Sequence, residues 1–339
     1  MLYLQNKLNC NKQNLSLINK HFYTTRNCLK KWFLATLFFS FSALANDDAT
    51  TWLSKMKTAL SEQQFEMSFV VVHGNKADPW RWYHGQINGQ EIEVLTSLNG
   101  PGQQIVRRGD NVTYLQPEQL AYTIQGNVPA GPIPEIIRSD ISKISQWYDF
   151  HLVGKSRVAG LPARLIRVIA KDNNRFNYWL WLHEESGLLL KSALINQQGE
   201  VLEQLQVSNL QIQSEPNELI AEVAKAELPE PYNLVPSQSH LVLDWSIGWM
   251  PEGFAKVKSD QHYLLGQKEI VDYMMLTDGV VWFSVYVRRL NTGDKITIGE
   301  FSSGANHYAS HQIGEYEVTL IGKIPPKTAN QLLKSIYWN

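Results

Sequence analysis

The run NYWLWLH at residues 177–183 places five large apolar side chains in a row, and this run restricts the fold more than any other feature. Successive side chains of a β-strand point to opposite faces of the sheet, so a strand over this run has two apolar faces. A sheet with one face in water alternates polar and apolar residues instead. We therefore expect a sheet whose inner face meets a core and whose outer face is also covered.

Strand-like runs separated by turn residues extend on both sides of this segment. Before it come FEMSFVVVH, RWYHGQI, EIEVLTSL, QQIVRRG, NVTYLQ, LAYTIQG and ARLIRVIAK, and after it come GLLLKSALIN and EVLEQLQVSNLQI. The intervening sequences NGQ, GDN, DNN and NQQG are turns of hairpin length. These runs predict one large antiparallel sheet over residues 46–214.

Two segments of the same region have helical spacing. The segment NDDATTWLSKMKTALSEQQ places Trp52, Met56, Ala59 and Leu60 on one face at helical spacing, and Asp47 or Asp48 before them can cap a helix. Residues 133–150, IPEIIRSDISKISQWYDF, suit one or two short helices. A large sheet with a few helices predicts an α+β fold class.

A change of composition predicts a second domain. Residues 215–238 are acidic and rich in proline, which favours a short helix followed by an extended linker. Residues 239–339 then predict a smaller antiparallel sheet, with strands that include HLVLDWSIGWMPEGF and VVWFSVYV. A C-terminal helix closes this domain, with one apolar face made by Ala329, Leu332, Leu333 and Ile336.

The first 45 residues predict a leader with a cleaved signal peptide. Lys30 and Lys31 precede the apolar run WFLATLFFSF, and the small residues ALA end it at Ala45. The run is too short for a membrane span, which needs about 20 apolar residues. The stretch before Lys30 is long for such a leader, so a later translation start near Leu29 is an alternative. Export without a lipid anchor indicates the periplasm, although full secretion is also open.

Removal of the leader makes the protein acidic and cysteine-free. Both cysteines, Cys10 and Cys28, lie in the leader, which excludes disulfide and thiol chemistry in the mature chain. Six of the 31 basic residues also lie there, which leaves 25 against 32 acidic residues and a net charge of −7. Nucleic acid and anionic membrane surfaces bind cationic proteins, so we expect neither as a partner.

Motifs for catalysis or metal binding are missing from the sequence. Residues 300–306, EFSSGAN, lack the GxSxG spacing of an exposed nucleophile. His307 and His311 lack the intervening glutamate of an HExxH site, and neighbouring glycines favour a loop. His73 and His84 flank a tryptophan-rich turn and are predicted as surface residues. We therefore expect no enzyme, no metal and no cofactor.

The excess of apolar residues in residues 46–214 has two interpretations. The first is an ordinary core between the sheet and its helices. The second is a curved sheet that encloses an apolar cavity, as near the mouths of barrels. Under the second interpretation, the residues predicted to line a lipid groove are Phe69, Val71, Trp80, Trp82, Trp179 and Trp181.

Two blocks of sequence carry a resemblance to a known family. The first contains EMSFVVVH, VRRGDNVTYLQP and the long run WYDFHLVGKSRVAGLPARLIRVIAKDNNRFNYWLWLHEESGLLLKSALINQQGEVLEQLQV. The second contains WMPEGF, TDGVVWFSVYV and LIGKIPPKTANQLLKSI. On these segments the mature chain resembles the RseB/MucB family, periplasmic negative regulators of the envelope-stress sigma factor.

The resemblance implies a fold and a mechanism. It implies an N-terminal unclosed barrel like that of the lipoprotein carriers, with helices that plug a hydrophobic groove. The smaller C-terminal domain would help to bind the periplasmic region of a membrane-spanning anti-sigma factor, shielding it from site-one proteolysis. Lipid or lipopolysaccharide fragments in the groove would release that partner, because two ligands that prefer different conformations weaken each other equally. The family also implies a homodimer.

The partner-binding residues are predicted around the second block. They are Trp249, Phe254, Arg288 and Arg289, with the arginines as charges at the rim. The alternative that these residues belong to core strands with solvated ends stays open. A second functional class, a periplasmic lipid or lipoprotein carrier, uses the same barrel. The extra C-terminal domain favours the regulator, because a simple carrier does not need it.

Overall fold

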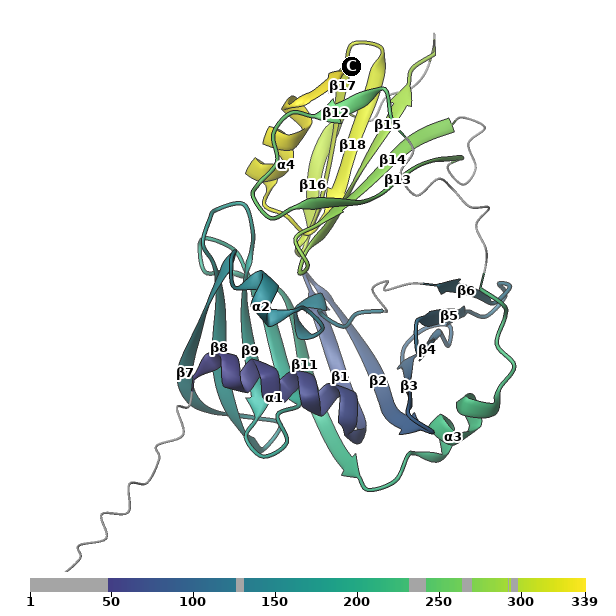
Figure 1. The fold of residues 1–339 in the computed structure, drawn as a ribbon, viewed down its shortest axis with the longest axis vertical. Coiled ribbons are helices and arrows are strands. Elements are labelled where there is room, and N and C mark those ends of the chain that lie inside the picture. The colour runs from purple at the N-terminus through teal and green to yellow at the C-terminus, as the bar shows by residue number, and fades with distance from the viewer. Residues whose placement is uncertain (1–47, 126–130, 232–241, 264–269, 292, 294–297) are drawn as a thin grey trace, which may run out of the picture. The chain divides into compact units, whose positions relative to one another are not determined.

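The computed structural model describes residues 48–125, 131–231, 242–263, 270–291, 293 and 298–339 (Figure 1). The leader and signal peptide predicted for residues 1–45 lie outside this part of the chain. Among the described helices, none combines the length and the apolarity that crossing a bilayer requires.

The larger sheet has eleven antiparallel strands. They are β1 (Gln64–His73), β2 (Lys76–Ile87), β3 (Gln90–Ser97), β4 (Gln104–Arg108), β5 (Asn111–Leu115), β6 (Tyr122–Gln125), β7 (Tyr148–Val158), β8 (Leu161–Ala170), β9 (Asn177–His183), β10 (Leu189–Ile195) and β11 (Val201–Gln213). Their order is β6-β5-β4-β3-β2-β1-β11-β10-β9-β8-β7. Because β6 and β7 stand at opposite ends of this order, the sheet is unclosed, and the predicted fold class is confirmed.

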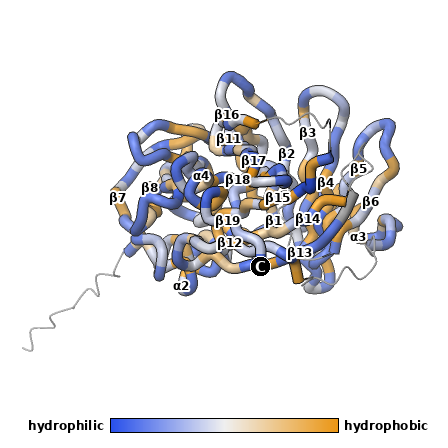
Figure 2. Tube along the Cα trace, turned by 90° about the horizontal axis from the view of Figure 1, so that it is seen from above, coloured by the Kyte–Doolittle hydropathy of each residue, from blue (hydrophilic) through white to orange (hydrophobic). Residues whose placement is uncertain are grey.

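Helices cover both faces of this sheet. On the inner face lie α1 (Ala49–Glu62), which crosses the strands in Figure 1, η1 (Glu135–Ile137) and α2 (Ile141–Ile144). On the opposite face, α3 (Glu218–Lys225) buries Ile220 against Ile92 and Val94 of β3. Hydrophobic stretches follow the strands, and hydrophilic ones gather at the turns between them (Figure 2).

Helix α1 forms where the sequence predicts it. The Asp48 carboxylate accepts hydrogen bonds from the backbone nitrogens of Thr50 and Thr51 at 2.6 and 3.0 Å, which satisfies two donors of the first turn. One face of the helix is buried in the core, and it consists of Ala49, Trp52, Leu53, Met56, Ala59 and Leu60. The predicted helical period therefore identified the face that packs on the sheet.

Strand β9 shows what covers both faces of the apolar run. Tyr178, Leu180 and Leu182 are buried in the core, whereas Trp179 and Trp181 alternate with them and are half-buried on the outer face. Their rings contact each other, with centroids 6.2 Å apart. The Arg167 guanidinium lies 4.5 Å from the Trp179 ring and the Lys191 ammonium 4.8 Å from the Trp181 ring. Cationic side chains, rather than a second layer of structure, cover this part of the outer face.

The smaller sheet has six antiparallel strands in the order β13-β14-β15-β18-β17-β16. They are β13 (Ala255–Tyr263), β14 (Ile270–Thr277), β15 (Trp282–Arg289), β16 (Gly299–Ser303), β17 (Asn306–Ile313) and β18 (Tyr316–Gly322). Helix α4 (Pro326–Lys334) packs against it, and β12 (Trp245–Ile247) pairs with β19 (Ile336–Trp338). The predicted small sheet with a C-terminal helix is confirmed, whereas the predicted domain boundaries stay predictions.

Two local predictions for this region are wrong. Ile336 does not continue the apolar face of α4, because the helix ends at Lys334 and Ile336 pairs with Ile247 in β19. The run HLVLDWSIGWMPEGF forms only the short strand β12 within its described residues. Pro251 and the left-handed Gly253, with φ of +86°, turn the chain before β13.

Candidate functional site

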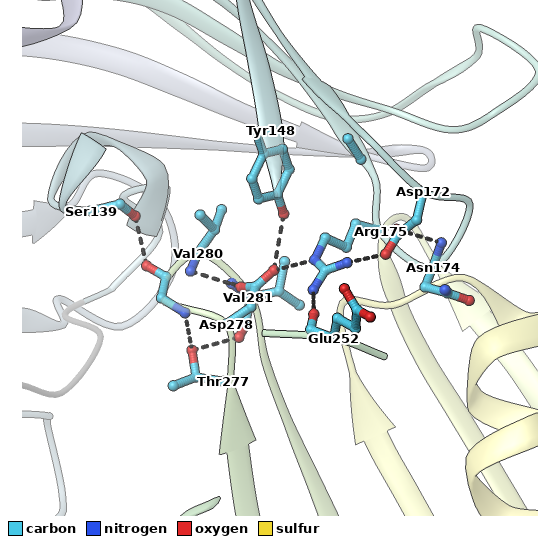
Figure 3. Close-up of polar contacts among 12 residues, drawn as sticks. Ser139, Tyr148, Asp172, Asn174, Arg175, Glu252, Thr277, Asp278, Val280 and Val281 are labelled. Carbon is cyan, nitrogen blue, oxygen red and sulfur yellow. Dashed lines mark hydrogen bonds and ion pairs between the residues drawn. The ribbon is translucent and has the colours of Figure 1, made fainter. Parts of the chain in front are cut away.

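A buried arginine–aspartate pair joins the loops of the two sheets. Arg175 immediately precedes Phe176 and β9, and Asp278 follows the last residue of β14. Both side chains have 0% exposure, and the Arg175 Nε donates to Asp278 Oδ2 at 2.7 Å. Figure 3 shows this pair at the centre of a polar network. We call Arg175, Asp278 and the groups bonded to them the junction.

Arg175 makes two further hydrogen bonds, and two aromatic rings contact its guanidinium. Its terminal nitrogens donate to the Asp172 carboxylate and to the backbone carbonyl of Glu252 (Figure 3). The guanidinium carbon lies 4.9 Å from the Phe254 ring and 5.6 Å from the Trp147 ring. Aromatic contacts of this kind stabilise a cation that has lost its water.

Hydrogen bonds from side chains to the backbone stabilise the turn that contains Asp278. Asp278 Oδ1 accepts hydrogen bonds from the backbone nitrogens of Val280 and Val281 at 2.9 and 2.8 Å. Gly279, with φ of +94°, donates its backbone N–H to the Thr277 hydroxyl at 2.9 Å. The Asp278 carboxylate therefore holds the turn with one oxygen and Arg175 with the other.

Tyr148, the first residue of β7, adds a third strand to the junction. Burial raises the pKa of its hydroxyl well above the usual value, and the negative charge of Asp278 raises it further. The hydroxyl therefore stays protonated and donates to Asp278 Oδ2 at 3.2 Å. Both oxygens of Asp278 are thus fully hydrogen-bonded, as a buried charge requires.

Gly253 allows the segment 249–254 to approach the larger sheet closely. A Cβ atom built on Gly253 would lie 2.3 Å from Cε2 of Trp147, and its φ of +86° is one that other residues rarely adopt. This approach brings the Glu252 carbonyl and the Phe254 ring to Arg175. The glycine in WMPEGF is therefore needed for the junction.

Residues 131–147, which we call the plug segment, connect the inner face of the larger sheet to the junction. Arg138 donates to both carboxylate oxygens of Glu93 in β3, at 2.7 and 2.6 Å. The next residue, Ser139, donates its hydroxyl to the backbone carbonyl of Gly279 at 2.7 Å (Figure 3). The apolar side chains that this segment buries in the core are Ile133, Ile136, Ile137 and Ile144.

A cavity of about 260 Å³ lies between the plug segment, strands β9 to β11 and the loops of the smaller sheet. Its lining includes Glu135, Tyr178, Val281 and an ion pair in which the Lys323 ammonium lies 2.8 Å from both oxygens of Glu203. Burial raises the pKa of Glu135, against the opposing charges of nearby arginines and Lys323. Helices and the plug segment therefore pack on the inner face, and this partly polar cavity lies beside them.

One group of side chains has the composition of a metal site. Ligand atoms of His84, Glu91 and Glu93 lie within 4.8 Å of one another in the described part of the chain. Arg138 already neutralises Glu93 and lies 3.9 Å from Glu91. A guanidinium therefore occupies the place where a cation would bind, and the group acts as an ion-pair network.

The prediction that His84 is a surface residue is wrong. It is 1% exposed, its ring stacks on Phe65 at 4.9 Å, and its Nδ1 lies 2.6 Å from the Gln63 carbonyl. His84 pairs with Phe65 in the sheet register, so it faces the core. The expected loop at His307 and His311 is instead strand β17, where four residues span roughly 13 Å.

The structure separates the predicted lipid-groove residues into two groups. Phe69, Val71 and Trp82 are buried in the core on the inner face. Trp80 pairs with Phe69 and lies half-buried at the same face. Trp179 and Trp181 lie on the outer face, as described above. The two groups lie on opposite faces of the sheet and therefore do not line one common groove. Lipid contact of the inner-face residues stays a prediction.

The predicted partner-binding residues also differ in their surroundings. Trp249 is half-buried and lines a depression of about 350 Å³ beside the junction, together with Trp147 and Met250. Phe254 is 6% exposed beneath Arg175. The Arg288 side chain is bonded to Glu317 at 2.6 Å. Arg289 is exposed and 3.0 Å from Glu315. Their role in binding stays a prediction.

Sequence reasoning missed Arg175 and Asp278. Both lie in turns, DNNRF and TDG, that predict only chain reversals. The pair is separated by 103 residues, so no local pattern relates one to the other. The available signal was an arginine directly beside an apolar strand, which has to be paired if it is buried.

Two family models match the chain. The model described as the MucB/RseB N-terminal domain matches residues 48–232, and the model described as the MucB/RseB C-terminal domain matches residues 239–337. Together they cover most of the chain, including every residue of the junction.

Curated relatives and a solved structure agree with these matches. The Sigma-E factor regulatory protein RseB of Haemophilus influenzae is 31% identical over 303 residues, covering 89% of this chain and 95% of the relative. The protein of the same name from Salmonella typhimurium is 30% identical over 305 residues, covering 89% and 94%. A crystal structure of MucB in complex with MucA(peri) has a TM-score of 0.67 and 25% identity, covering 86% of this chain and 99% of that one. Both relatives are named as regulatory proteins, which confirms the prediction of a non-enzymatic protein.

Arg175→Met is expected to lower the free energy of unfolding by about 3–5 kcal/mol, because it leaves the Asp278 charge buried and uncompensated. Adding Asp278→Asn should recover part of this loss, since the amide oxygen still accepts from Val280 and Val281. Urea unfolding followed by tryptophan fluorescence measures both variants, with the exposed Arg157→Met as control. Equal losses in the single and double variants would contradict the charge-pair account.

Glu135→Gln is expected to raise the free energy of unfolding at about pH 7.5. The raised pKa means that the folded state binds the proton more tightly than the unfolded chain does, so ionisation opposes folding. The gain should shrink as pH falls through this raised pKa and vanish below about pH 3.5, where both states are protonated. Denaturant titrations across this range measure it, with the exposed Glu222→Gln as control. A gain independent of pH would show that the charge is not responsible.

Proposed function

The chain belongs to the MucB/RseB family, and from this premise we propose that it binds the periplasmic region of a membrane-spanning anti-sigma factor. Binding would shield that region from site-one proteolysis and so keep sigma-E-type envelope-stress signalling off. The observation that carries the proposal is the complex of MucB with MucA(peri), which aligns over 99% of the MucB chain. The curated relatives are sigma-E regulators by name.

Export to the periplasm is part of the same proposal. It is supported by the predicted signal peptide that ends at Ala45 and by the cysteine-free mature chain. A partner segment on the periplasmic side of a membrane would be accessible only to an exported protein. Homodimer formation stays a prediction from the resemblance.

The depression beside the junction is the surface we favour for the partner. Trp249 and Met250 offer half-buried apolar side chains there, and aromatic residues dominate binding energies at protein interfaces. Arg288 is already paired with Glu317, so it is less suited to anchor a second carboxylate. Phe254 would act indirectly, by positioning Arg175 and the segment 249–254.

We further propose that a lipid or lipopolysaccharide fragment weakens partner binding by displacing the plug segment. The inner face is occupied by buried isoleucines of this segment, so an acyl chain has to replace them. Each buried methylene contributes about 0.8 kcal/mol, which offsets the loss of those contacts. Two contacts resist this displacement: the ion pair of Arg138 with Glu93 and the hydrogen bond from Ser139 to the Gly279 carbonyl.

The hydrogen bond of Ser139 would couple lipid binding to partner binding. Ser139 is bonded to Gly279, and the neighbouring Asp278 holds Arg175, which in turn holds the Glu252 carbonyl. Displacing the plug segment would remove the Ser139 hydrogen bond and loosen the turn. If the partner requires the intact arrangement, lipid and partner weaken each other by the same factor.

A carrier of lipids or lipoproteins is the alternative function. The match to the MucB/RseB C-terminal domain over residues 239–337 favours the regulator, because the relatives with both domains are named as regulatory proteins.

The full mature chain is expected to retain the periplasmic segment of its cognate anti-sigma factor in a pull-down from lipid-free buffer. Added lipopolysaccharide is expected to reduce the retained amount, and a scrambled segment of equal composition is the control. Absence of binding without lipid would refute the regulatory proposal. Binding that no lipid changes would leave the partner assignment standing and refute the lipid part.

The double variant Glu93→Gln with Arg138→Met is expected to release the partner at a lower lipopolysaccharide concentration than the wild type. It removes the ion pair that ties the plug segment to β3 and neutralises both of its members, so neither of these two charges is left buried without the other. Competition titrations with a fluorescent segment measure the midpoint. The control is Glu66→Gln with Arg81→Gln, an ion pair on the outer face. Identical midpoints for both double variants would contradict plug displacement.

A further inference from the structure

A second cavity, separate from the junction, lies where helix α4 begins. Its volume is about 510 Å³. Its apolar lining includes Phe176, Leu202 and Ile324, and its polar lining includes the amides of residues 196–198, His307 and Lys327. The lining therefore combines an apolar floor with amide side chains, one imidazole and one ammonium group. This volume is in the range of sites for small ligands.

The first turn of α4 opens onto this cavity without a side-chain cap. Pro325 occupies the N-cap position and cannot supply a capping oxygen, and Pro326 follows as the first helical residue. The positive end of the helix dipole is therefore uncompensated by its own sequence. Lys327 is exposed in the same turn and adds a full positive charge.

His307 provides an independent sign of a ligand. It is 3% exposed and lines the cavity, and its Nε2 is buried without a hydrogen-bond partner. The nearest carboxylate oxygen belongs to Glu300 and lies 3.6 Å away, beyond hydrogen-bonding distance. That oxygen accepts instead from Asn330 at 2.8 Å. A buried polar atom in this state normally has a partner.

The Ser302 hydroxyl determines what His307 can offer. Ser302 Oγ lies 2.9 Å from His307 Nδ1. Burial lowers the pKa of His307, so the ring is neutral near neutral pH. In the tautomer in which Ser302 donates to Nδ1, the proton sits on Nε2, which then lacks an acceptor.

We propose that this cavity binds a carboxylate that terminates an apolar residue, as at the C-terminus of a peptide. The carboxylate would accept from Nε2 of His307 and from the backbone N–H of Lys327, since Pro325 and Pro326 carry no N–H. The apolar side chain would pack on Phe176, Leu202 and Ile324. The amides of residues 196–198 can both donate to and accept from a peptide backbone. A phosphate is less suited, because the lining holds one cation and no arginine.

The test uses the full mature chain and the dipeptide N-acetyl-Leu-Phe as a probe, with calorimetric titration. The free acid is expected to bind, and the C-terminal amide to bind at least about tenfold more weakly. Lys327→Gln is expected to weaken binding of the free acid by roughly fivefold. Lys334→Gln, which removes an exposed lysine from the last turn of the same helix, is the matched control.

A second variant tests the histidine directly. His307→Phe keeps an aromatic ring in the core and removes Nε2, so binding of the free acid should be lost while the near-ultraviolet circular dichroism stays native. Equal binding of acid and amide, or equal effects of the two lysine variants, would overturn the proposal. Tighter binding of inorganic phosphate than of the free acid would also overturn it. None of these results depends on binding of an anti-sigma segment, so this proposal can fail without the regulatory one.

Discussion

The contact between Arg175 and Asp278 is the interaction on which the rest of the site depends. Removing two charges from water costs several kcal/mol per ion, and the attraction between them offsets this only when every remaining hydrogen bond is satisfied. Asp172, Glu252 and Tyr148 supply further hydrogen bonds to the pair, and aromatic rings contact the guanidinium. The partners come from both sheets, so only one arrangement of these loops satisfies all of them. Such a pair contributes more to the choice of conformation than to net stability.

The plug segment connects the Asp278 turn to the inner face of the larger sheet. At residue 138 it is bonded to the inner face of the sheet, and at residue 139 to the turn that holds Asp278. Two consecutive residues are therefore bonded to two different parts of the structure. Because residues 138 and 139 share one planar peptide unit, a ligand that displaces one contact is expected to disturb the other. Coupling of 1–3 kcal/mol between two sites, typical of allosteric proteins, is of the order of the hydrogen bonds involved.

The sequence predicted those parts of the fold that depend on local pattern. Turn sequences and two-residue alternation located the strands, and Asp48 with its helical period located α1. Alternation could not say which face of β9 meets the core, nor that Arg167 and Lys191 cover its tryptophans. The lipid-groove prediction mixed both faces for this reason. The junction was unpredictable because its partners are 103 residues apart and each lies in a sequence typical of a turn. His307 was recognised as a histidine of interest, but its unpaired nitrogen depends on the packing of β16, β17 and α4.

The central claim is that the plug segment and the Asp278 turn respond together to lipid and to partner. Hydrogen–deuterium exchange of the full mature chain measures both regions at once. The account predicts slower exchange in residues 135–147 and 277–282 when the anti-sigma segment binds, and faster exchange in both when lipopolysaccharide is added. A lipid that accelerates exchange in the plug segment while the turn at Asp278 stays unchanged would contradict it.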